Sequence, residues 1–107
     1  MAGKSRRQAL EEMLAADPTD VETRYCLGMD YVGAGDPESA ARVFREVIAQ
    51  NPAKPYIPAF QMAAQSLLKL GRRNDVIAIL KQGIKEAQKQ NDLHPMSEMQ
   101  ALLDSVE

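Results

Sequence analysis

The chain carries one cysteine, Cys26, and one histidine, His94, which is the minimum set for a thiol nucleophile with an imidazole base. Nothing else in the sequence supports such a dyad. Cys26 stands beside the apolar residue Leu27, where a half-buried thiol is expected, and His94 stands in an expected loop before Pro95. A single cysteine forms no intramolecular disulfide, and no Cys/His spacing typical of a metal site occurs. We therefore expect neither a metal site nor a cofactor.

Two further patterns resemble parts of nucleotide-binding or catalytic motifs but lack the other residues that such motifs require. The run Gly33-Ala34-Gly35 lacks the later glycine of a dinucleotide fingerprint and the Lys-Ser/Thr of a P-loop. It fits a helix C-terminus, where glycine is common. The neighbouring acids Glu11 and Glu12 fall on one exposed helix face without partners for catalysis. The sequence predicts a protein that is not an enzyme.

A basic ridge is the remaining chemical signal. Lys81, Lys85 and Lys89 recur every fourth residue, and Arg72 and Arg73 precede them. Nucleic-acid binding is one interpretation, but the net charge is −2 and no aromatic residues interleave with the lysines. A solvated helix face is the simpler reading, and nucleic acid is not the expected partner.

Charge is segregated along the chain. Residues 9–38 have a net charge of −7 and residues 39–90 a net charge of +6. This asymmetry would steer an acidic partner, or let the acidic half of one copy meet the basic half of another. A set of ordinary solvated helix faces is the favoured explanation.

The elements that would hold these residues are all helices. The 107 residues suit one domain, 45% are apolar, and no segment shows the sustained alternation of a strand. Apolar spacing and caps predict six helices: 5–16, 20–34, 37–50, 58–70, 75–90 and 95–106. Leu10, Met13 and Leu14 share the apolar face of the first.

Caps and breakers set these boundaries. Thr19 and Glu22 have the spacing of a capping box, Asp36 with Pro37 starts the third helix, and Asn74 is the expected cap of the fifth. The segment "NPAKPYIP" is a loop because its prolines cannot continue a helix. No apolar run approaches the ~20 residues of a membrane span. The N-terminus lacks a secretory signal, so we expect a cytoplasmic protein without membrane contact.

The helices repeat. Leu10, Phe44 and Leu80 fall in matching places, offset by 34 and 36 residues, and Gly35 and Gly71 are 36 apart. A period of about 34 residues built of helix, turn and helix is typical of a solenoid. The pattern residues of the first repeat are Leu27, Gly28, Tyr31, Ala40, Phe44 and Pro52. Those of the second are Phe60, Ala64, Leu67, Gly71, Val76 and Leu80.

These residues resemble the tetratricopeptide repeat (TPR) family. Arg24 beside Tyr25 departs from it at the usual tryptophan, as do Gly83 at a usual alanine and Gln88 at the closing proline. The resemblance implies an all-α solenoid of antiparallel helix pairs forming one domain, 1–107. Its parts would be a leading half repeat (5–18), two repeats (21–54 and 57–90) and a capping helix (95–107). Gly28 and Ala40 would then be the small residues that let two helices approach, with Phe44 projecting into the gap between neighbouring helices.

The resemblance also implies the function of a protein-interaction module with a concave groove for a peptide or helix. The groove positions it carries over are Glu22, Tyr25, Met29, Val32, Gly33, Pro58, Gln61, Gln65, Leu68 and Lys69. Tyr25 and Met29 replace the Lys and Asn of TPR domains that clamp carboxylates, so the groove is mostly apolar. Packing against neighbouring helices is the alternative role for Tyr25, Met29 and Val32. A self-associating structural module, a homo-oligomer, is the alternative function.

Overall fold

The computed structural model describes residues 3–107 and contains six α-helices there, with no strand in that range. Their bounds are α1 Arg6–Ala16, α2 Val21–Gly33, α3 Pro37–Gln50, α4 Ile57–Lys69, α5 Arg73–Lys89 and α6 Leu93–Val106. The expected helix count and all-α class are confirmed. No helix in residues 3–107 is long and apolar enough to cross a bilayer.

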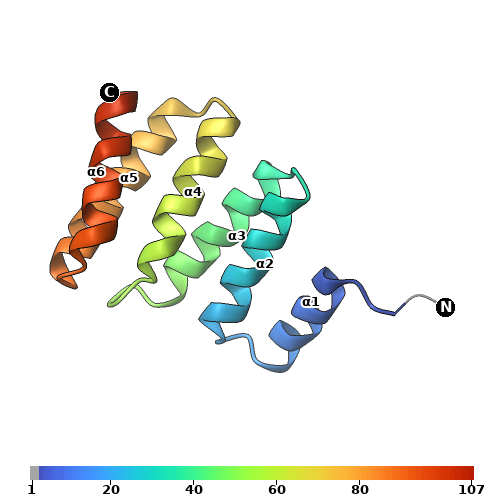
Figure 1. Cartoon of the computed structure of the whole chain (residues 1–107). Coiled ribbons are helices and arrows are strands. Elements are labelled where there is room, and N and C mark those ends of the chain that lie inside the picture. Colours follow the sequence, from blue (N-terminus) through green and yellow to red (C-terminus); the bar gives the residue numbers. More distant parts are fainter. Residues whose placement is uncertain (1–2) are drawn as a thin grey trace.

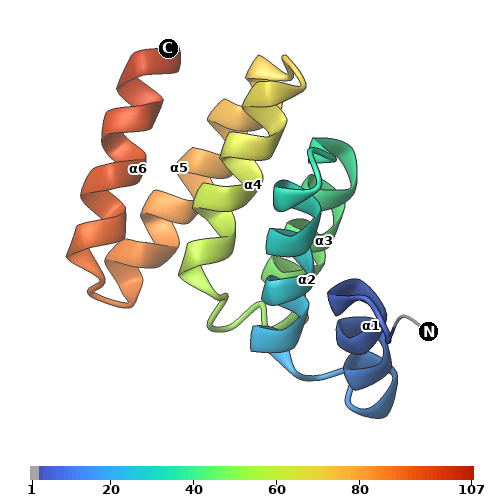
Figure 2. The same cartoon turned by 45° about the vertical axis from the view of Figure 1, so that its right-hand side comes forward.

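The helices form a two-layered, curved stack. Each helix packs against the next along the chain, and α4 also touches α6. Figures 1 and 2 show α2, α4 and α6 in one layer and α3 and α5 in the other, with α1 at the N-terminal end. The result is an elongated body of 49 × 29 × 19 Å. It is the expected solenoid of antiparallel helix pairs.

Three helices, α2, α4 and α5, end in the same type of turn. After α2, the Gly35 N–H donates to the Val32 carbonyl and the Asp36 N–H to the Tyr31 carbonyl, a Schellman motif. The same bonds follow α4 at Gly71 and α5 at Asn91. Gly35 and Gly71 have φ of +72°, which only glycine adopts without strain, and Asn91 has φ of 56°.

The start of α2 differs from expectation. Asp20, not Thr19, is the N-cap: its carboxylate accepts from the Thr23 N–H at 3.2 Å and from the Thr23 hydroxyl at 2.7 Å. Thr19 is diverted because its hydroxyl and its N–H both donate to the Asp17 carboxylate. The proposed Thr19–Glu22 capping box is therefore wrong.

Two other boundaries also differ. The N-cap position of α5 is Arg72, whose side chain makes no capping hydrogen bond, so Asn74 is no cap. The Schellman turn at Gly71 leads directly into the helix. α6 starts at Leu93, two residues before the expected start at Pro95, which places His94 in its first turn and not in a loop. Asp36 and Pro37 start α3 as expected, with the Asp36 carboxylate accepting from the Ser39 N–H.

The main core runs between the two layers, from Ala40 on α3 to Leu103 on α6. Phe44, Phe60, Leu80 and Met99 are completely buried in it. A smaller cluster of Leu10, Leu27 and Val43 holds α1 against α2 and α3. Leu14 packs on this cluster, but Met13 is 52% exposed, so Met13 does not share the buried face of α1.

The helix crossing at Gly28 explains why glycine stands inside α2. A Cβ built there would lie 2.5 Å from Cε1 of Phe44, whose ring is fully buried. Gly83 in α5 is a second such position, since its Cβ would lie 2.6 Å from Met99 Sδ and 2.7 Å from Phe60 Cβ. Two glycines thus allow aromatic side chains to fill the gaps between helices.

Candidate functional site

A hollow of about 240 Å³ opens between the C-terminal halves of α2 and α4; we call it the α2–α4 hollow. Val32 and Met62 give it apolar walls, while Gln65, Ser66 and Lys69 supply polar atoms. Gly35 and Pro37 from the α2–α3 turn complete it. A volume this small suits one large side chain and falls below the usual range for drug-sized ligands.

Local sequence features position this hollow. The Schellman turn at Gly35 reverses the chain immediately after Val32, and Pro37 fixes the first turn of α3 beside it. On α4, Met62, Gln65, Ser66 and Lys69 follow the 3-1-3 spacing of a single helix face. The walls are therefore two helix ends held by fixed turns.

Lys69 provides the charge at this site. Its side chain is exposed in the last turn of α4, and among residues 3–107 no acidic oxygen lies within ion-pair distance of it. The ammonium group is thus available to an anionic or carbonyl group of a ligand. Ser66 is only 3% exposed, at the base of the hollow.

The structure brings together three of the expected groove residues, Val32, Gln65 and Lys69. Glu22 lines another hollow, of about 380 Å³, with Tyr56 and Pro58 at the opposite end of α2 and α4. Met29 and Gly33 line a third with Arg6 of α1. Gln61 is half-buried and Leu68 is 42% exposed, and neither lines any hollow described here.

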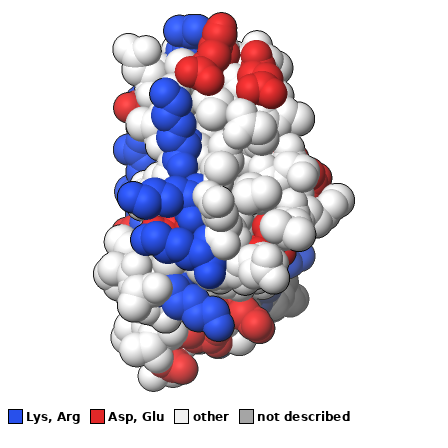
Figure 3. All heavy atoms as spheres, turned by 90° about the vertical axis from the view of Figure 1, so that its left-hand side faces the viewer, with Lys and Arg blue, Asp and Glu red and all other residues white. Residues whose placement is uncertain are grey.

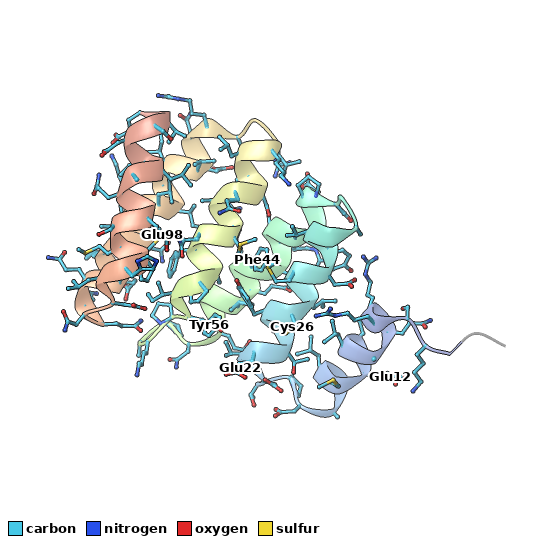
Figure 4. The ribbon with its side chains drawn as sticks, viewed as in Figure 1. Glu12, Glu22, Cys26, Phe44, Tyr56 and Glu98 are labelled. Carbon is cyan, nitrogen blue, oxygen red and sulfur yellow. The ribbon has the colours of Figure 1, made fainter. Side chains whose placement is uncertain are left out.

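Tyr25 packs between helices. Its ring lies 5.4 Å from that of Phe44 and 5.2 Å from that of Tyr56, centroid to centroid. Burial raises the pKa of the Tyr25 phenol above its usual value, and the nearby Tyr56 and Cys26 add to this shift. Figure 4 shows Tyr56 at the start of α4 and Phe44 on α3, so the three rings join three helices. Core packing accounts for much of the Tyr25 surface.

Sequence reasoning missed Met62, Ser66 and Pro37 in the α2–α4 hollow. Met62 and Ser66 are neither pattern residues nor groove positions of the repeat, and Pro37 was assigned only to helix initiation. For Met62 and Ser66, the one available signal is their helical spacing from Gln65 and Lys69, which places all four residues on the same face of α4.

The Cys26–His94 dyad does not exist. Cys26 packs beside the Leu10 cluster at the N-terminal end, whereas the His94 side chain is 86% exposed on α6 and lies 3.2 Å from Glu98. Figure 4 shows Cys26 on α2 and Glu98 on α6, with α4 between them. Residues 3–107 hold no group of three side chains suited to a metal ion.

The basic ridge lies along the exposed side of α5. Figure 3 shows a band of Lys and Arg side chains on the face formed by α5 and α6, beside a largely uncharged area. Lys81 lies 3.6 Å from Glu107, Lys89 3.5 Å from Glu86, and Arg72 2.8 Å from Glu38. Part of the ridge is thus neutralised within the chain.

Exposed ion pairs also link the helices. Arg72 of the basic half pairs with Glu38 of the acidic half, which offsets a little of the charge contrast between them. Arg24 lies 3.8 Å from Glu46, and Arg45 of α3 lies 3.8 Å from Asp75 of α5. Each of these pairs contributes little to stability.

Comparison with known proteins places this architecture. The tetratricopeptide repeat family matches residues 31–103. A tetratricopeptide repeat domain protein from Salinibacter ruber, solved by NMR, superposes with a TM-score of 0.76 at 26% identity, over 85% of this chain and 90% of that one. No curated protein matches the sequence.

Two further solved structures, with lower sequence identity, share the fold. A protein from Bordetella parapertussis has a TM-score of 0.79 at 23% identity, over 97% of this chain and 89% of that one. MamA has a TM-score of 0.67 at 17% identity, over 94% of this chain and 66% of that one. The fold is common to all three, and the family match spans most of the helices described above. The chain belongs to the tetratricopeptide repeat family.

Proposed function

We propose that this protein binds a peptide or helix of a partner protein, with an apolar side chain of that partner seated in the α2–α4 hollow. The supporting observation is the hollow itself, with apolar walls at Val32 and Met62 and the unpaired Lys69 at its rim. Tetratricopeptide repeat proteins are in general protein–protein interaction modules, typically non-enzymatic scaffolds.

The chemistry of the hollow sets the class of ligand. An apolar side chain would contact Val32, Met62 and Pro37, and these contacts would supply most of the affinity. Methionine suits such contacts because its unbranched thioether adapts to different shapes. Lys69 favours an acidic or carbonyl group next to the anchor, and Gln65 offers an amide for backbone hydrogen bonds. We therefore expect short motifs that combine one large apolar residue with an acidic neighbour.

Other groove positions would extend the contact. Glu22 lies beyond Tyr25 toward the loop that carries Tyr56, Gln61 lies one helical turn before Gln65, and the exposed Leu68 adjoins Lys69. Met29 adds an apolar group at 36% exposure on the α1 side. A partner segment running along α2 and α4 would meet these residues in turn.

Selection from a displayed peptide library would test the proposal. Peptides that bind the wild-type protein are measured again with Gln65→Trp, which fills the hollow, and with Lys69→Glu, which reverses the rim charge. Both side chains are exposed, so the fold should be retained. Lys85→Glu makes the same charge change on α5 and is the matched control.

We expect each hollow variant to weaken binding by about tenfold or more, which is about 1.4 kcal/mol. The Lys85→Glu control should bind like wild type. Equal affinity for the wild-type protein and both hollow variants would remove the α2–α4 hollow as the binding site.

A further inference from the structure

The two terminal helices, α1 and α6, each expose a face whose counterpart on an inner helix of the stack is buried. α1 corresponds to α3 at an offset of 34 residues, which matches Leu10 with Phe44, and α6 corresponds to α4 at an offset of 36. α3 packs against a helix on either side, but in residues 3–107 α1 packs against no helix before it and α6 against none after it. Each end is half of a helix pair.

On α6 this face is open. Ala64 of α4 is completely buried, whereas its counterpart Gln100 is exposed; Ile57 is 3% exposed, whereas its counterpart Leu93 is 57% exposed. A groove of about 510 Å³ runs between α5 and α6 beside this face, which we call the α5–α6 groove. Ile84, Met96 and Ala101 give it apolar surface, and Gln100 and Asp104 stand at its C-terminal end.

On α1 the same comparison holds. Ala40 and Val47 of α3 are 0% and 1% exposed because α2 and α4 cover them, whereas their counterparts Arg6 and Met13 are exposed. Arg6 places a cation where α3 has Ala40, a small residue at a helix crossing. Met13, at 52% exposure, replaces a fully buried valine.

The two open faces complement one another. In the antiparallel α2–α3 pair, the C-terminal half of the first helix meets the N-terminal half of the second. The same arrangement of α6 with α1 of another copy places Arg6 at the end of α6 that carries Asp104. At the opposite end it places Met13 toward Leu93 and Met96. One contact is ionic and the other apolar, and the register of the repeat aligns both.

Charge supports a second copy as the occupant. Among residues 3–107, Arg6 has no acidic oxygen and Asp104 no basic nitrogen within ion-pair distance. Within residues 3–107, Asp104 accepts a hydrogen bond from the Gln100 amide, at 2.9 Å. Two exposed, oppositely charged side chains thus stand toward the ends of the two helices that the antiparallel pairing brings together. Met13 and Leu93, two of the four exposed large apolar side chains among residues 3–107, lie at the other end.

We infer that copies of this chain associate head to tail, with α1 of one copy seated in the α5–α6 groove of the next. The pair α6–α1 then completes a helix hairpin across the interface. Because the two surfaces differ, the contact is heterologous. This interface is separate from the α2–α4 hollow, so its failure would leave the proposed peptide site intact.

Sedimentation velocity at increasing protein concentration tests this inference. We expect the wild-type weight-average sedimentation coefficient to rise with concentration, and more strongly at low salt, where the Arg6–Asp104 attraction is less screened. Arg6→Glu alone or Asp104→Lys alone should weaken association by about tenfold or more, because each places like charges together. The double variant Arg6→Glu/Asp104→Lys should restore it.

Two controls make the outcome specific. Glu98→Lys makes the same charge change on α6 but outside the groove, and should associate like wild type. Met13→Ser changes no charge and should weaken association by removing the apolar contact. Circular dichroism would verify that each variant is folded. A wild-type protein that stays monomeric at every concentration, or single charge variants that associate like wild type, would overturn the inference.

Discussion

Gly28 allows the close packing of the first helix pair. Any side chain there meets the buried Phe44 ring, since a Cβ would stand 2.5 Å from Cε1. We expect Gly28→Leu to lower the free energy of unfolding by about 1–3 kcal/mol through overpacking. Phe44→Ala should cost about 3–5 kcal/mol through the cavity it leaves.

Thermal and urea denaturation would measure both changes. Gly33→Ala is the control, because Gly33 ends the same helix and, apart from its own helical backbone and chain neighbours, no atom in residues 3–107 lies within 4 Å of its Cβ position. Alanine is the better helix former, so this variant should be at least as stable as wild type. A Gly28→Leu protein as stable as Gly33→Ala would refute the close crossing.

Tyr25 should make the fold sensitive to alkali. Burial raises the pKa of its phenol in the folded state, so folding favours the protonated form. The resulting stability is present below the unfolded pKa of about 10 and is lost as pH rises through the folded pKa. Stability measured by urea denaturation should therefore fall above about pH 10. The fall should be smaller for Tyr25→Phe; superimposable pH profiles would contradict the buried setting of this phenol.

At the scale of single residues, sequence could identify Gly28 but not Gly83. Gly28 belongs to a repeat pattern that also supplies Phe44. Gly83 instead stands where the pattern has alanine, and the atoms that require glycine there come from Phe60 on α4 and Met99 on α6. Only the assembled layers reveal that requirement.

Helix α2 depends on Asp20 for its N-terminus. Hydrogen bonds from the Thr23 hydroxyl and then from its N–H lower the pKa of the Asp20 carboxyl, because they stabilise the charged form. Stability from this cap is present above the unfolded pKa of Asp and declines as pH falls through the folded pKa. We expect Asp20→Ala to lower Tm more than Thr19→Ala, measured by circular dichroism at neutral pH. At acidic pH the Asp20→Ala penalty should shrink; a larger effect from Thr19→Ala would restore the Thr19 cap.

At the scale of elements, the six helices followed from their periodicity, while the starts of α5 and α6 and the cap of α2 did not. Thr19 and Asp20 are adjacent and both residue types cap helices, so the choice depends on Asp17 competing for the Thr19 hydroxyl. Asn74 failed as a cap because the turn after Gly71 already sets the direction of α5. Such local competition is decided by three-dimensional geometry.

At the scale of the whole molecule, the arrangement of the helices determines which residues form each candidate binding surface. A repeat pattern assigns residues to the inner face, but it does not say which of them meet. Val32, Gln65 and Lys69 converge because the turn at Gly35 stops α2 beside α4, whereas Tyr25 turns into the aromatic contact with Phe44 and Tyr56. The division into a half repeat, two repeats and a cap remains a prediction. The two open end faces appear only when α1 and α6 are compared with the buried α3 and α4.

NMR chemical-shift mapping would show whether partner peptides bind in the α2–α4 hollow. A library-selected peptide would be titrated into isotope-labelled protein. We predict that the largest amide and methyl shifts cluster at Val32, Met62, Ser66 and Lys69, with α5 lysines unaffected. Shifts confined to α5 and α6, with those four residues unmoved, would contradict the account.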